Sequence, residues 1–153
     1  MRIIPYPFLF ILFLFSVSLS LFAQQNTVVD GLLEEEKATF EKSVYLILAA
    51  SGQIDEEFSS AEALQLITPK EWHVKVKNPD DPIPLGTLAA IVMKAFDFKG
   101  GLLYTIFPGP RYALREIAFR GFVQGRVSPY MYVSGAEAAT IVRKALVWKG
   151  EYR

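Results

Sequence analysis

The 153-residue sequence contains no cysteine, one histidine and no excess charge, because 16 lysines and arginines balance 16 aspartates and glutamates. The lack of cysteine excludes disulfide bonds, thiolate zinc sites and cysteine nucleophiles. His73 has no second histidine and no metal-binding spacing of carboxylates around it, so we expect a surface histidine and no metal or cofactor. Nucleic acid is not an expected partner either, because its recognition relies on an overall basic surface.

Candidate catalytic groups are equally scarce. The acidic runs at 34–36 and 56–57 fall at a predicted helix start and in a loop, where solvated carboxylates are the ordinary case. No pair of residues has the spacing of a nucleophile with its base, or of two opposed catalytic acids. The glycines at 100–101 lack the following Gly-Lys-Ser/Thr of a phosphate loop. We therefore expect a noncatalytic protein with no catalytic residues.

The only long hydrophobic run lies at the start of the chain. Residues 1–23 contain 17 apolar residues, with an unbroken block from Phe8 to Phe15 that follows one arginine and precedes several serines and Ala23. This order predicts a secretory signal peptide cleaved after Ala23, and hence export to the periplasm or cell envelope. About 20 apolar residues can also span a bilayer, so a retained anchor is the alternative. Only in that case would a membrane be an expected partner.

The remainder of the chain has helical hydrophobic periodicity, which predicts an all-α fold, a compact bundle of about five helices. A polar lead-in is expected at 24–32 and a helical domain at 33–150. Within the domain the expected helices run from Leu33 to Ser51, from Ser59 to Ile67, from Leu88 to Gly100, from Arg111 to Arg120 and from Ser134 onward, with a short extended piece at 72–77.

Residues typical of helix caps mark several of these boundaries. Ser59 with Glu62, and Ser134 with Glu137, have the spacing of capping boxes, in which side chains bond the free amides of a helix start. Gly121, like Gly52 earlier, is placed to end a helix in the left-handed conformation. These residues are expected to define the fold rather than to bind a ligand.

Self-comparison indicates an internal repeat. Residues 89–100 align without gaps with residues 139–150, and seven of the twelve positions are identical. Helix, glycine stop, loop and capping box also recur in the same order, which amphipathic spacing alone does not explain. The predicted repeat units are 39–68, 83–100, which holds only the second helix, and 110–148.

This unit resembles the S-layer homology repeat. The residues that carry the resemblance are Gly121-Phe122-Val123-Gln124-Gly125, then Pro129, then Val133-Ser134-Gly135-Ala136-Glu137. The resemblance implies helical pairs around a pseudo-threefold axis and a role in anchoring exported proteins to envelope polysaccharides. The arginine of the family's capping box is missing, because Gly135, Ser60 and Leu85 stand at the three corresponding positions. The helical scaffold therefore carries over better than the polysaccharide site.

Charge is unevenly divided along the chain. Residues 24–62 carry nine acidic and two basic residues, whereas residues 63–153 carry seven acidic and 13 basic ones. One interpretation is a basic surface for an anionic glycan or membrane phosphate. The other is that the two halves pack together or are simply solvated. The candidate basic residues are Arg111, Arg115, Arg120, Arg126, Arg143 and Lys144. Tyr104, Tyr112, Tyr130 and Tyr132 are either a sugar-stacking platform or ordinary packing residues.

The predicted binding surface consists of Arg111, Tyr112, Arg115, Arg126 and Tyr130, which are close in sequence. It favours an exported, noncatalytic module that docks to peptidoglycan or an anionic wall polymer, because guanidinium groups suit carboxylate or phosphate. The alternative is a periplasmic protein-interaction or structural module without glycan binding, whose partner is an envelope protein. A hydrolase of cell-wall material is the third and least supported hypothesis.

Overall fold

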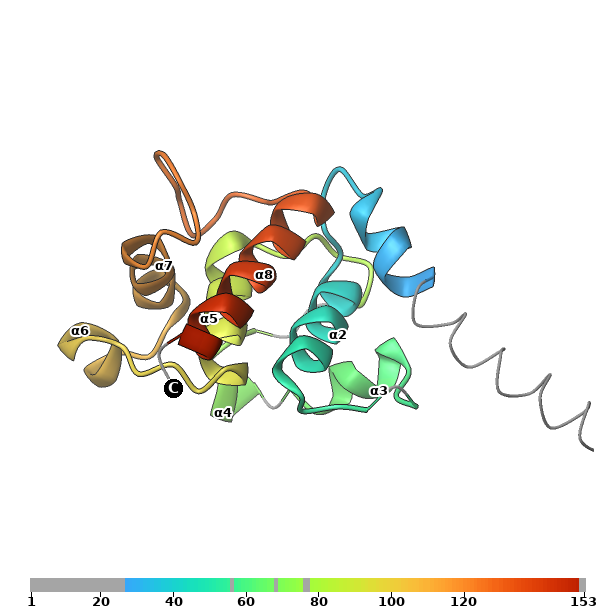
Figure 1. Cartoon of the computed structure of the whole chain (residues 1–153), viewed down its shortest axis with the longest axis horizontal. Coiled ribbons are helices and arrows are strands. Elements are labelled where there is room, and N and C mark those ends of the chain that lie inside the picture. Colours follow the sequence, from blue (N-terminus) through green and yellow to red (C-terminus); the bar gives the residue numbers. More distant parts are fainter. Residues whose placement is uncertain (1–26, 56, 68, 76–77, 152–153) are drawn as a thin grey trace, which may run out of the picture.

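The computed structural model describes residues 27–55, 57–67, 69–75 and 78–151, so the predicted signal peptide lies outside the described residues. The described chain is mostly helical and contains no strand, which confirms the all-α class. Residues 27–33 are helical, and the further helices are α2 (Phe40–Ser51), α3 (Ser60–Gln65), α4 (Pro69–Trp72), α5 (Leu85–Ala95), α6 (Leu102–Ile106), α7 (Pro110–Phe119) and α8 (Gly135–Glu151) (Figure 1).

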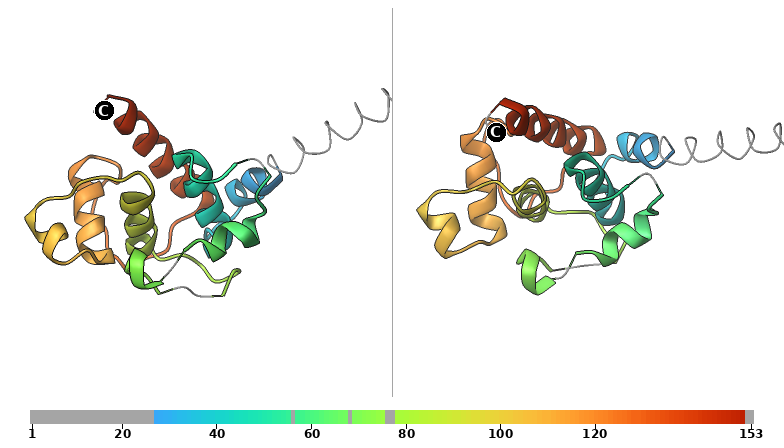
Figure 2. Two further views of the ribbon diagram at one scale, coloured as in Figure 1. Left: turned by 90° about the horizontal axis from the view of Figure 1, so that it is seen from below. Right: turned by 60° about the horizontal axis from the view of Figure 1, so that its bottom comes forward.

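Helix α5 lies at the centre of the molecule and contacts α2, α4, α7 and α8 (Figure 2). Nine of its eleven residues are buried, including Leu88, Ile91 and Val92 with no exposed surface. A helix that is apolar on every side must be enclosed on every side, and this one is. The buried core cluster extends from Leu32 to Ala145.

The starts of α2, α5 and α8 meet at a common junction. The chain is extended just before each helix, and these extended residues bond to one another rather than forming a sheet. Ala38 N donates to Val133 O at 2.8 Å, and Ile83 N donates to Ala38 O at 2.9 Å. Leu85 N donates to Met131 O at 2.8 Å. Backbone groups buried at this junction are therefore paired with one another.

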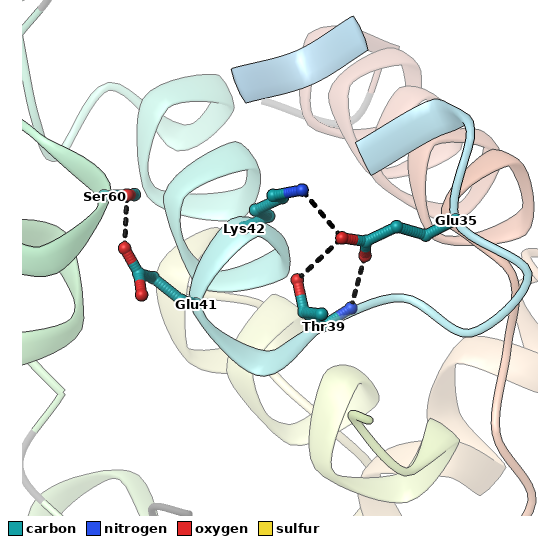
Figure 3. Close-up of polar contacts among 5 residues, drawn as sticks. All are labelled: Glu35, Thr39, Glu41, Lys42 and Ser60. Atoms are coloured by element: carbon teal, nitrogen blue, oxygen red, sulfur yellow. Dashed lines mark hydrogen bonds and ion pairs between the residues drawn. The ribbon is translucent and has the colours of Figure 1, made fainter. Parts of the chain in front are cut away.

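The first predicted helix is interrupted in the structure. The sequence favours one helix from Leu33 to Ser51, but residues 34–39 separate a helical segment within the expected lead-in from α2. The Glu35 carboxylate accepts a hydrogen bond from Thr39 N at 2.7 Å and forms an ion pair with Lys42 at 2.8 Å (Figure 3). These bonds, with the extended pairing at the junction, override a periodicity that would continue the helix.

Three helices end in the same way. In α2 and α7, Gly52 and Gly121 are left-handed, with φ of 74° and 75°. Gly121 N donates to Ala118 O, and Phe122 N donates to Ile117 O, both at 2.9 Å, which is the Schellman arrangement expected from the sequence. Helix α5 ends with equivalent bonds, although the left-handed residue there is Asp97 with φ of 53°.

Other boundaries differ from expectation. Helix α5 ends at Ala95 instead of Gly100, because the left-handed turn at Asp97 comes first. The segment 72–77 is not an extended piece where it is described, since α4 includes Trp72 and His73 has φ of 54°. Helices α4 and α6 were not expected, because four or five residues are too few to show helical periodicity.

Candidate functional site

A largely apolar surface hollow lies between the loop after α7 and the first turns of α8. This groove has a volume of about 420 Å³. Its apolar lining includes Phe122, Val127 and Met131 from the loop, and Ile141 from α8. An apolar concavity with a few polar groups at its rim is the ordinary form of a small-ligand or sugar site.

The loop that forms one wall of the groove turns at two glycines. Gly121 and Gly125 have φ of 75° and 79°, and a Cβ atom on either would meet no other atom within 4 Å. The requirement for glycine is therefore conformational and not one of space. Both glycines belong to the five-residue motif that carries the family resemblance.

Two of the polar side chains at the groove are available to a ligand. Arg126 and Gln124 form no hydrogen bond or ion pair with any residue that the structure describes. Glu137 is engaged, because its carboxylate accepts from Ser134 N at 2.8 Å, which completes the predicted capping box. Lys144 donates to the carbonyl oxygens of residues 121 and 122 at 2.9 and 3.0 Å. Lys144 therefore ties α8 to the end of α7.

The structure divides the predicted binding surface. Arg126 lines the groove, and Tyr130, which is 84% exposed, lies in the loop that forms the groove wall. Arg111 and Arg115 are exposed on the outer side of α7, and Tyr112 stacks on Phe107 there. None of these three lines the groove. Proximity in sequence suggested one surface, but the turn at 121–125 separates the residues into two.

Arg120 has a structural role instead of belonging to a free basic surface. Its guanidinium donates to Lys99 O at 2.6 Å and lies over the rings of Phe98 and Trp148, at 5.5 and 5.6 Å from their centroids. Glu116 completes the set with an ion pair at 3.6 Å. The described residues form two ion pairs, one inside the acidic half, between Lys42 and Glu35, and one inside the basic half, between Arg120 and Glu116. Neither of them joins the acidic half to the basic half.

Of the three positions that the resemblance aligns with its capping-box arginine, Gly135 and Leu85 are enclosed and Ser60 is half-buried. Gly135 packs so closely that a Cβ atom would lie 1.6 Å from the carbonyl oxygen of Leu32. Leu85 is 2% exposed, and the Ser60 hydroxyl donates to the Glu41 carboxylate (Figure 3). A side chain as large as arginine at 135 or 85 would require repacking of these neighbours.

The four candidate tyrosines do not line a common hollow. Tyr104 and Tyr112 belong to α6 and α7, whereas Tyr130 and Tyr132 belong to the loop before α8. Burial, with a contribution from Glu116, raises the pKa of the Tyr104 phenol. Tyr132 is 44% exposed, and the Lys37 ammonium lies 5.6 Å from the centre of its ring. The loop pair is the one beside the groove.

Two polar residues of the groove, Gln124 and Thr140, were not among the candidate residues named from the sequence. Gln124 stands inside the glycine motif, so the motif was the available signal for this residue, whereas Thr140 in α8 lies outside it and had no such signal.

Comparison with models of protein families, with curated proteins and with solved structures finds no match for this chain. No group of three or more histidine, aspartate or glutamate residues among those described could hold a metal ion. Within the same residues, no helix combines the length and apolar character needed to cross a membrane.

Proposed function

We propose that this protein is an exported, noncatalytic helical module that docks to a cell-envelope glycan, either peptidoglycan or an anionic wall polymer. The groove beside α8 is the proposed binding site. The observation that carries the proposal is its composition, an apolar floor with an unpaired arginine and an unpaired amide at the rim. Sugar rings present apolar C–H faces and hydroxyl edges, which such a groove matches.

Three neighbouring side chains suit a charged glycan. The Arg126 guanidinium can offer paired donors to a carboxylate or phosphate. Tyr130 and Tyr132 present exposed aromatic faces in the adjacent loop, and an aromatic ring with a polar tip suits contact with sugars. These groups come from a loop whose shape depends on Gly121 and Gly125.

The proposed architecture is a divergent S-layer homology scaffold. Its support is the meeting of α2, α5 and α8 at one junction, together with three Schellman ends. At this junction Thr39, Pro84 and Ser134 each stand just before a helix. The sequence comparison pairs Pro84 and Ser59 with Ser134, so Thr39 takes the place of Ser59 in this relation. We propose that the repeated element is the long helix with its extended lead-in.

The second candidate function is a periplasmic protein-interaction or structural module. The inward packing at Gly135 and Leu85 favours it, because the family's charged contact is missing and cannot be restored locally. In that case the groove would receive a side chain of a partner protein. Binding to purified sacculi separates the two candidates.

The decisive experiment measures sedimentation of the protein with purified sacculi, before and after removal of secondary polymers. We expect binding that Arg126→Gln with Tyr130→Ser lowers by roughly tenfold, because paired donors and a stacking face are lost. The matched control is Arg111→Gln with Arg115→Gln, which removes two exposed arginines away from the groove. Binding lost in the control but kept in the groove variant would move the site to the outer side of α7. Absence of binding by the unaltered protein would favour a protein partner.

A further inference from the structure

Helix α6 is an apolar helix outside the core. None of its five residues, Leu-Leu-Tyr-Thr-Ile, is buried. Leu102 is 76% exposed, Ile106 and Phe107 are each 56% exposed, and Leu103 is 44% exposed. A contiguous exposed apolar surface on a small protein usually marks an interaction site.

The position of α6 is set by two contacts with α7. Gly101 N donates to Glu116 Oε1 at 2.9 Å, and Phe107 stacks on Tyr112 at a centroid distance of 5.9 Å. Phe119, which is 91% exposed, lies one helical turn beyond Glu116, whose carboxylate accepts the hydrogen bond from Gly101 N just before α6. We call the five side chains Leu102, Leu103, Ile106, Phe107 and Phe119 the α6 tip. Both figures place α6 at the end of the molecule opposite residues 27–33 (Figures 1 and 2).

Exposed arginines border the α6 tip. Arg111 and Arg115 precede Phe119 at intervals of four residues, so the three share one side of α7. The carboxylate of Glu116 is already used by Gly101 N and Arg120. Asp97 lines a hollow with Tyr104 and Thr105 of α6, and Lys94 lines the same hollow with the opposite charge. The border that α7 gives to the tip is therefore cationic.

We propose that the α6 tip docks this protein on an anionic lipid surface. The apolar side chains enter the boundary between headgroups and acyl chains, while Arg111 and Arg115 meet lipid phosphates. We choose an anionic lipid surface as the partner because α6 lies at one end of the molecule and because Arg111 and Arg115 border its apolar side chains. A second copy of this chain, docked tip to tip, would bring the same arginines face to face, which is unfavourable.

The test is flotation with vesicles of phosphatidylcholine, with or without phosphatidylglycerol. The full chain and the chain starting at Gln24, which retains the whole core cluster, are both measured. We expect binding to the anionic vesicles that weakens as salt is added, because exposed charges are screened. Leu102→Ser with Ile106→Ser, and separately Arg111→Gln with Arg115→Gln, should each lower binding by roughly tenfold. Leu146→Ser with Val147→Ser is the matched control, since both residues are exposed on α8.

A site-specific probe identifies which part touches the lipid. Because the chain has no cysteine, Leu102→Cys can be labelled selectively with an environment-sensitive fluorophore, and Leu146→Cys provides the control. We expect a blue shift with anionic vesicles at 102 and none at 146. A shift at 102 that grows with protein concentration without lipid would overturn the proposal in favour of a second copy. Binding of no vesicle, or binding unchanged by the tip variants, would also overturn it. Sacculus binding is measured separately, so neither proposal depends on the other.

Discussion

Helices α5 and α6 are built from similar residues and have opposite surroundings. Both are dominated by leucine, isoleucine and other apolar side chains, yet nine residues of α5 are buried and none of α6 is. Neither helix has a side-chain cap at its start. The difference therefore lies in their lengths and in their tertiary contacts. Helix α5 is enclosed by four other helices, whereas α6 contacts α7, packs only Tyr104 against the core and leaves its leucines and Ile106 exposed.

The comparison shows that an apolar sequence predicts a helix but does not tell whether that helix is buried in the core. Burial stabilises a fold by roughly 25 cal/mol for each Å² of apolar surface, so α5 carries much of the stability. Helix α6 contributes little to the core, and its apolar residues require another explanation. Docking to a lipid surface supplies one.

The largest expected effect separates the two helices directly. Ile91→Ala in α5 removes a side chain with no exposed surface and should destabilise the protein by about 3 kcal/mol, through lost transfer energy and a residual cavity. Ile106→Ala in α6 makes the same chemical change at a residue that is 56% exposed, and should cost less than about 0.5 kcal/mol. Urea denaturation measures both. Equal losses would mean that α6 belongs to the core.

The next effect concerns the connection between the two helices. Arg120→Gln removes the hydrogen bond to Lys99 O and the contacts with Phe98 and Trp148, so we expect a loss of about 2 kcal/mol. Arg115→Gln is the control on the same helix, and its exposed side chain should make it nearly neutral. Thermal melts of the two variants give the comparison. A neutral Arg120 variant would show that the end of α5 does not need this clamp.

Much of the fold could be predicted from the sequence, because the capping residues and helix-ending glycines stand at the ends of helices in the structure. The all-α class, α7, the left-handed glycines and both capping boxes follow from periodicity and cap chemistry. The break before α2 and the early end of α5 did not follow. The first depends on backbone hydrogen bonds with residues 81, 83 and 133, and the second on a left-handed aspartate where glycine is the usual signal.

The candidate site was only partly accessible. Arg126 and Tyr130 were named from sequence and lie in or beside the groove. Arg111 and Arg115 were grouped with them, because linear distance cannot show that the chain turns away at Gly121. The role of Arg120 was missed for the same reason, since Phe98 and Trp148 are distant in sequence.

The left-handed ends of α7 and α5 give the third prediction. Gly121→Val should cost about 1–2 kcal/mol, because a β-branched residue resists φ of 75° even where space is open. Asp97→Gly should leave stability unchanged or raise it by up to about 1 kcal/mol, because it relieves the same conformation at the end of α5. Chemical denaturation tests both. A neutral Gly121→Val would contradict the assigned helix end.

The smallest effect concerns α3, a second short helix, which has the side-chain cap that α6 lacks. The Ser59 hydroxyl and amide both bond the Glu62 carboxylate, and these bonds lower the pKa of Glu62. Because the pKa of Glu62 is lower in the folded state, the ionised Glu62 cap stabilises the fold at pH values above the ordinary pKa near 4.5. This stabilisation is lost as the pH falls through the pKa of the folded state. Ser59→Ala should raise the pKa of Glu62, as measured by NMR titration, and speed amide exchange at the start of α3. Exchange in α5 should not change, because burial and not capping protects that helix. An unaltered Glu62 titration would mean that α3, like α6, is held only by its neighbours.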